Sequence, residues 1–127
     1  MKLMTLALLC AGIGFGQSDD RDTLDKCQEA VKTNPRNSLA HFRQGEIYLS
    51  QGKYQEAGNE LRLSLIGDLN PRWIEVWAHV ELGKVYDSTR QRERALNEYR
   101  TALRTLDNTR GALDEAKKYT EAPYKPN

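Results

Sequence analysis

The sequence predicts an all-α protein built from stacked antiparallel helix pairs, a short α-solenoid closed by a C-terminal capping helix. Three observations support this class. Apolar side chains recur with helical spacing, no β-branched run alternates with polar residues, and one pattern is written twice along the chain. The two copies read A-H-x-x-x-G-x-x-Y, begin at Ala40 and Ala78, and lie 38 residues apart. Repeats of this length usually mark stacked structural units.

The first sixteen residues, MKLMTLALLCAGIGFG, are predicted to be a cleaved signal peptide. Lys2 precedes an apolar run over residues 3–15, and Gly14-Phe15-Gly16 places small residues at the expected cut. This run is shorter than the ~20 residues that span a bilayer, so a retained anchor is less favoured. Lipid attachment at Cys10 is less favoured still, because Leu9 is bulky. We therefore expect an exported chain, periplasmic or secreted, without stable membrane insertion.

Composition limits what the mature chain, residues 17–127, can bind. Without Lys2 the chain's 19 basic residues become 18, equal to its 18 acidic residues. A net charge of zero favours neither nucleic acid nor a charged surface as partner. One thiol remains, Cys27, which cannot form an internal disulfide and is predicted to be a small buried side chain.

Each copy of the pattern is expected to form two helices. Helix-forming residues run over 38–50, 54–66, 72–88 and 92–106. Asn34-Pro35 and Asn70-Pro71 precede the first helix of each pair, where proline is tolerated and disfavours helix in the residue before it. Residues 109–120 are expected to form the capping helix within a C-terminal segment, 108–127, that ends in an extended tail containing Pro123 and Pro126.

Glycine and histidine have structural interpretations within each copy. Gly45 and Gly83 cost ~1 kcal/mol of helix propensity each, so they are expected where two helices cross closely and a tyrosine three residues on fills the space beside them. His41 and His79 hold equivalent positions one unit apart, too far to share a proton or metal ion. They are predicted to be packing aromatics with a polar tip.

These residues resemble the tetratricopeptide-repeat signature, Leu-Gly-x-x-Tyr in a first helix and Ala-x-x-x-aromatic in a second. The second copy has Leu82-Gly83-x-x-Tyr86 and Ala95-x-x-x-Tyr99. The first has Gly45-x-x-Tyr48 and Ala57-x-x-x-Leu61, and Cys27-x-x-Ala30-Val31 is similar to the end of an earlier second helix. The resemblance implies about two and a half repeats over residues 17–107. Four extra residues around IGDLNPRW are expected to lengthen the junction or the helix after it.

The resemblance also implies a non-catalytic protein–protein interaction module. In the family the first helices line a concave groove that binds a peptide or partner helix. Carried over by position, the groove here would comprise Leu39, Phe42, Glu46, Leu49, Trp77, Val80, Lys84 and Asp87. Aromatics beside isolated charges are typical of such surfaces. Trp73 and Trp77 keep an alternative interpretation as core residues covered by the cap or the tail.

Other functions are less favoured. The chain has no Gly-rich phosphate loop, His-x-x-x-His, Cys-x-x-Cys or Gly-x-Ser-x-Gly, so no catalytic, cofactor or metal site is predicted. The chaperone-tail clamp of the family needs Asn and Lys where this chain has Glu46 and Phe42. Self-association as part of an envelope assembly is the main alternative, because zero net charge and a spare Trp/Val stripe suit a homodimer. Carriage of a small ligand or lipid, and a hydrolytic activity, follow in that order.

Overall fold

The computed structural model describes residues 17–127, which form six α-helices and one short 3-10 turn without any strand. In chain order these are α2 (Gln17–Thr33), α3 (Ser38–Ser50), α4 (Tyr54–Leu65), α5 (Ile74–Ser88), α6 (Arg92–Arg104), η1 (Thr109–Gly111) and α7 (Ala112–Glu121). The predicted all-α class is confirmed. The predicted signal peptide, residues 1–16, lies outside the described residues.

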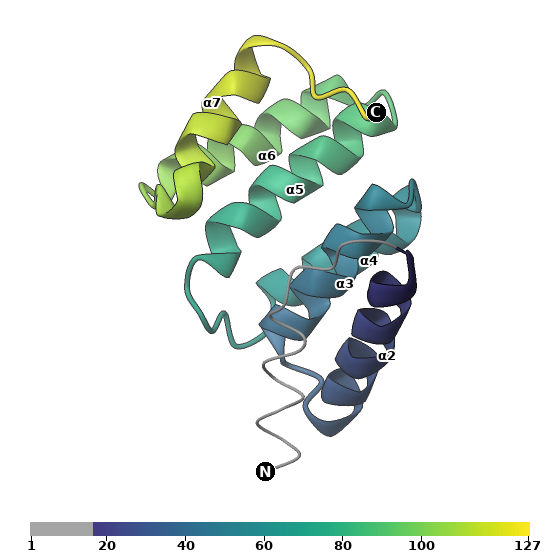
Figure 1. The fold of residues 1–127 in the computed structure, drawn as a ribbon. Helices are drawn as coiled ribbons and strands as arrows, with labels where there is room; N and C mark the ends of the chain where they lie inside the picture. The colour runs from purple at the N-terminus through teal and green to yellow at the C-terminus, as the bar shows by residue number, and fades with distance from the viewer. Residues whose placement is uncertain (1–16) are drawn as a thin grey trace.

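The helices form a stack of antiparallel hairpins (Figure 1). α3 pairs with α4, α5 pairs with α6, and α4 packs on α5 to join the two hairpins. α2 packs on α3 at one end of the stack, and α7 packs on α6 and α5 at the other. α2 therefore stands where a second helix would stand, and α7 where a first helix would. The predicted solenoid with a C-terminal capping helix is confirmed.

Two apolar cores hold the stack together, and α5 contributes to both. One face of α5 packs with α3 and α4 in a core of Phe42, Ala57, Leu61, Ile74, Ala78, Leu82 and Val85. The other face packs with α6 and α7 in a core of Val76, Val80, Ala95, Tyr99, Ala102, Ala112 and Ala116. Full burial of a large apolar side chain stabilises a fold by about 1.5–3 kcal/mol, so these two cores are what hold the helices of the stack together.

The repeated glycines lie where the two helices of each hairpin cross. A Cβ on Gly45 would lie 2.7 Å from Leu61 Cγ of α4, and a Cβ on Gly83 would overlap the Tyr99 ring of α6. The predicted close crossing is therefore present in both hairpins. We expected the tyrosine three residues after each glycine to fill the space beside it. The structure instead places a side chain of the second helix there, Leu61 over Gly45 and Tyr99 over Gly83.

The repeated histidines connect the helices of their own hairpins. His41 Nδ1 lies 2.7 Å from Glu60 Oε2, and His41 Nε2 donates to the carbonyl of Pro35 at 2.8 Å. His79 Nδ1 makes the equivalent 2.7 Å contact with Glu98 Oε2. The hydrogen bond with Glu60 raises the pKa of His41 above its ordinary value, although burial opposes this. Each imidazole has its own carboxylate, so recurrence here reflects packing.

The four extra residues between the hairpins form a loop that folds back onto the start of α3. The N–H of Asp68 donates to the Arg36 carbonyl at 2.8 Å, and the N–H of Leu69 donates to Ser38 Oγ at 2.9 Å. Arg36 Nη2 donates in turn to the Gly67 carbonyl at 3.1 Å. The junction before α5 spans residues 66–73, eight residues against the four of 34–37 before α3, and α5 has 15 residues against 13 in α3. The insertion thus lengthens both the junction and the helix after it, although α5 begins at Ile74, two residues later than predicted.

Candidate functional site: a groove on the face of the first helices

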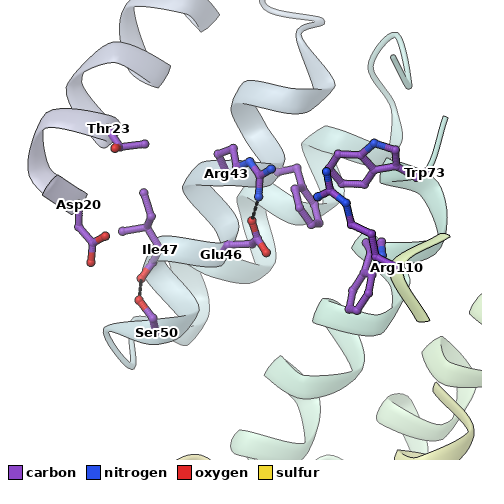
Figure 2. A pocket seen from close by; sticks show the side chains of 10 residues that line it. Asp20, Thr23, Arg43, Glu46, Ile47, Ser50, Trp73 and Arg110 are labelled. Atoms are coloured by element: carbon purple, nitrogen blue, oxygen red, sulfur yellow. Dashed lines mark hydrogen bonds and ion pairs between the residues drawn. The ribbon is translucent and has the colours of Figure 1, made fainter. Parts of the chain in front are cut away.

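A groove of about 520 Å³ runs along α3, between α2 on one side and the start of α5 on the other. Its lining residues are Asp20, Thr23, Phe42, Arg43, Glu46, Ile47, Ser50, Trp73, Trp77 and Arg110. Figure 2 shows that α3 runs through the middle, with the α2 residues on one side and Trp73 and Arg110 on the other. The groove therefore has an aromatic side toward α5 and a polar side toward α2.

The aromatic side is built around Trp73. Its ring meets Phe42 edge to face, with centroids 5.5 Å apart and planes at 81°. The guanidinium of Arg110 lies 4.8 Å from the Trp73 centroid, a cation–π contact. Trp77 Nε1 donates to the Thr109 carbonyl at 2.9 Å and so holds the turn that carries Arg110. This side is thus a fixed aromatic platform beneath an exposed cation.

The centre of the groove is an ion pair on α3. Arg43 Nη1 lies 2.6 Å from Glu46 Oε1, one helical turn away. The Arg43 guanidinium also lies 5.7 Å from the ring centroids of both Phe42 and Trp73. These contacts explain why Arg43 lies along the groove wall and does not extend into solvent.

Three of the eight predicted groove residues line this groove, namely Phe42, Glu46 and Trp77. Phe42 is only 1% exposed, so it contributes to the groove chiefly by supporting Trp73. Leu39 and Leu49 instead pack against the core between the hairpins, and Val80 is fully buried in the core under α7. Burial of Val80 leaves it unable to contact a partner while α7 is in place.

The remaining two, Lys84 and Asp87, are covered by the chain's own C-terminal segment. Lys84 Nζ lies 3.1 Å from Glu81 of α5 and 3.1 Å from Glu115 of α7. It also lies 5.5 Å from the ring centroid of Tyr124 in the tail. Burial lowers the pKa of Lys84, but the two carboxylates raise it by more, so it stays charged. Lys84 is therefore a structural ion-pair centre in this fold.

Asp87 holds the tail in place. Its Oδ2 accepts from the Tyr99 hydroxyl at 2.8 Å and from the N–H of Tyr124 at 2.9 Å, and it pairs with Arg92 at 3.0 Å. The side chain is only 1% exposed. The second half of the predicted groove is thus closed, because α7 takes the place of the next first helix and the tail crosses beside it.

Sequence reasoning missed the α2 side of the groove. Asp20, Thr23, Arg43 and Ile47 line it, because no first helix among residues 17–127 covers that face of α3. A signal was present in the repeat itself: Ile47 is equivalent to Val85, and both are apolar. Arg110 had no such signal, because it reaches the groove from a residue with φ of 56° in η1.

The described residues offer little else that binds or reacts. Within residues 17–127, no group of three His, Cys, Asp or Glu side chains is placed to hold a metal ion. Over the same range, none of the helices combines the length and apolar character needed to cross a membrane. Burial raises the pKa of Glu81 to about 7, and its neighbour Lys84 opposes that rise.

Stacked helical hairpins of this kind define a helical-repeat protein. Residues 26–58 match the family model described as the tetratricopeptide repeat. The match runs from α2 through α3 into α4, which agrees with α2 being the second helix of an incomplete repeat. The predicted resemblance to this family is confirmed over these residues, and a repeat of this family suggests a protein–protein interaction module. None of the curated proteins compared matches the chain.

Proposed function

We propose that the chain is a non-catalytic module that binds a peptide or helix of a partner protein in the groove between α2, α3 and α5. One observation carries this proposal. The groove combines the fixed Trp73 platform with the exposed guanidinium of Arg110, on the face that the repeat family uses for binding. Aromatic and arginine side chains dominate the binding energy of protein interfaces.

The proposal assigns partner contacts to the open groove and not to the second half of the predicted surface. Trp73, Trp77, Arg110 and Ile47 are the side chains that a partner can reach there. Lys84 and Asp87 instead hold α7 and the tail, so we assign them to stability. This division makes the two halves separable by mutation.

A quantitative pull-down from the host's envelope fraction tests the proposal. Ile47→Asp and Arg110→Glu each place an opposing charge in the groove, and both should lose the captured partner. Ile66→Asp is the matched control, because Ile66 is 70% exposed and lies outside the groove lining. Recovery of the same proteins, in the same amounts, by the groove variants and the control would remove the groove as the binding site.

Self-association through the same groove is the second candidate, favoured by the zero net charge of residues 17–127. Light scattering over a concentration series separates it from binding of a foreign partner. A mass that rises with concentration and falls back with Ile47→Asp would support a homodimer, whereas a constant monomer mass would remove it.

We also propose that the chain is exported, which the order of charged, apolar and small residues in 1–16 supports. Mass spectrometry of the protein recovered from the periplasm or the medium is the test. The expected N-terminus is Gln17. Recovery of the intact chain from the cytoplasm alone would contradict export.

A further inference from the structure

The tail, residues 122–127, lies beside the end of α5 as an extended segment (Figure 1). Ala122 ends α7 with extended backbone angles, φ −146° and ψ 139°. The N–H of Tyr124 then donates to Asp87 Oδ2, in the last turn of α5, at 2.9 Å. The tail therefore closes the part of the first-helix face that the end of α5 contributes.

Few contacts hold the tail in this place. Besides its bond to Asp87, Tyr124 meets the ring of Tyr119 edge to face, with centroids 5.4 Å apart. Arg92 donates to the carbonyl of Thr120, just before the tail, at 3.1 Å. The other tail residues are exposed, namely Ala122, Pro123, Lys125, Pro126 and Asn127. A segment that buries so little surface opens at a small fraction of the free energy of global unfolding.

A buried carboxylate of α5 lies next to the tail. Glu81 is only 6% exposed and pairs at 3.1 Å with Lys84, one helical turn later. The Lys84 ammonium lies 5.5 Å from the ring centroid of Tyr124 and 5.7 Å from that of Tyr119. Burial raises the pKa of the Tyr124 hydroxyl, Lys84 lowers it and Glu81 raises it, so Tyr124 is within the electrostatic reach of both charges.

The charges around Glu81 come from three first helices. Lys84 of its own helix favours the ionised form, whereas Glu46 of α3 and Glu115 of α7 oppose it. Lys84 is shared, because it also lies 3.1 Å from Glu115, and Glu46 is paired with Arg43 of its own helix at 2.6 Å. Burial outweighs these charges and raises the pKa of Glu81 to about 7. A proton on Glu81 therefore suits the closed arrangement.

Release of the tail would change the surroundings of Glu81. It would remove the Tyr124 ring from beside the Lys84–Glu81 pair and let water approach. Water stabilises an ionised carboxylate, so the pKa of Glu81 would fall toward its ordinary value. The closed state therefore binds the Glu81 proton more tightly than the released state. The tail is held fully below the released-state pKa, and less as pH rises through the closed-state value of about 7.

We infer that residues 122–127 form a releasable latch over the end of α5, and that ionisation of Glu81 favours its release. Release uncovers Lys84 and the Asp87 oxygen that accepts from Tyr124. The protein thus exposes more of its first-helix face in mildly alkaline than in mildly acidic surroundings. Release needs no partner, so this device is separate from the binding proposed for the groove along α3.

Amide exchange in the full chain, followed by NMR, tests the latch. The exchange rate of the Tyr124 amide is compared with that of the free peptide TEAPYKPN, residues 120–127, at the same pH. This ratio, the protection of Tyr124, cancels the direct effect of pH on exchange. It should fall about threefold or more between pH 5.5 and pH 8.5, since a pKa difference of about 0.5 between the two states corresponds to about threefold. No protection at pH 5.5, or protection that does not fall with pH, would overturn the inference.

Glu81→Gln identifies the group that titrates. Glutamine has nearly the same size and stays neutral, so the protection of Tyr124 should lose its pH dependence. Glu29→Gln is the matched control, because the Glu29 side chain is 62% exposed on α2 at the other end of the stack. This control should keep the fall of the parent chain. A fall that persists in Glu81→Gln would assign the titration to another group and overturn the inference.

A core amide distinguishes release of the tail from unfolding of the chain. Val80 is fully buried in the core of α5, α6 and α7, so its amide reports global opening. Low concentrations of urea should reduce the protection of Val80 and leave that of Tyr124 unchanged, because release exposes little surface. Equal protection of both amides would mean that the tail leaves only when the chain unfolds, which would overturn the inference. The pull-down with Ile47→Asp tests the α3 groove independently of either result.

Discussion

Replacing Gly83 with alanine tests the helix crossing on which the stack depends. In an isolated helix this change stabilises by about 1 kcal/mol. Here the added methyl would overlap the ring of Tyr99, which is fully buried. The ring cannot easily move aside, because its hydroxyl donates to Asp87 at 2.8 Å and its centroid lies 5.8 Å from that of the Tyr119 ring. Overpacking of a rigid core costs about 1–3 kcal/mol. Overpacking at the upper end, about 3 kcal/mol, less the gain in helix propensity of about 1 kcal/mol, should lower the free energy of unfolding by about 2 kcal/mol.

Urea unfolding followed by circular dichroism measures this loss, which corresponds to a melting temperature lower by roughly 6–8 °C for a domain of this size. Gly58→Ala is the matched control, because a Cβ there would meet only the end of the long Arg62 side chain, whose guanidinium lies 3.3 Å away and hydrogen-bonds the Tyr86 hydroxyl at 2.9 Å. It should stabilise by about 1 kcal/mol. In a Tyr99→Ala background, Gly83→Ala should stabilise as well. If Gly83→Ala stabilised the parent chain as Gly58→Ala does, the close crossing would be refuted.

Three further predictions concern buried charges. The folded-state pKa of His41 lies above its ordinary 6.5, so its bond with Glu60 stabilises the fold fully below pH 6.5 and less as pH rises through the folded pKa. Glu60→Gln should therefore lower the free energy of unfolding in urea more at pH 5.5 than at pH 9. Equal losses at the two pH values would contradict this. Burial raises the pKa of Glu81 from 4.5 to about 7, so the folded chain loses stability as pH rises through that interval. Glu81→Gln should accordingly gain roughly 3 kcal/mol on the parent chain between pH 4.5 and pH 8, and a pH-independent difference would argue against the shift. Asp87→Asn should cost about 2 kcal/mol and speed amide exchange at Tyr124 at least tenfold, and unchanged exchange would mean that the tail is held otherwise.

Most of the fold could be predicted from periodicity and punctuation. Asn37 before α3 and Gly52 after it mark its ends, and the structure shows why. Asn37 Oδ1 accepts from the N–H of Ala40 at 3.0 Å, and Gly52 takes a φ of 73° that favours glycine. The late start of α5 could not be predicted in this way. Leu69 and its neighbours are held by hydrogen bonds to residues about 30 positions earlier, which no local pattern records.

The candidate site could be predicted only in part, for a physical reason. Helical spacing places Val80 and Lys84 on the correct side of α5, but it does not show which later segment covers that side. α7 and the tail cover it, and a clue was available in the opposite charges of Lys84 and Glu115. The groove on the α2 side of α3 was missed because the groove positions were carried over from the repeat family. In a longer stack, a preceding first helix covers the position that Ile47 holds here.

Photo-crosslinking from position 47 in the living host tests the central claim most directly. A photoreactive amino acid replaces Ile47 in one strain and the exposed Ile66 in another, and crosslinked partners are compared by mass spectrometry. We expect a protein adduct from position 47 that is absent from position 66 and maps to one peptide or helix of the partner. Adducts of equal yield from both positions, or none from position 47, would contradict the claim that this groove receives a partner.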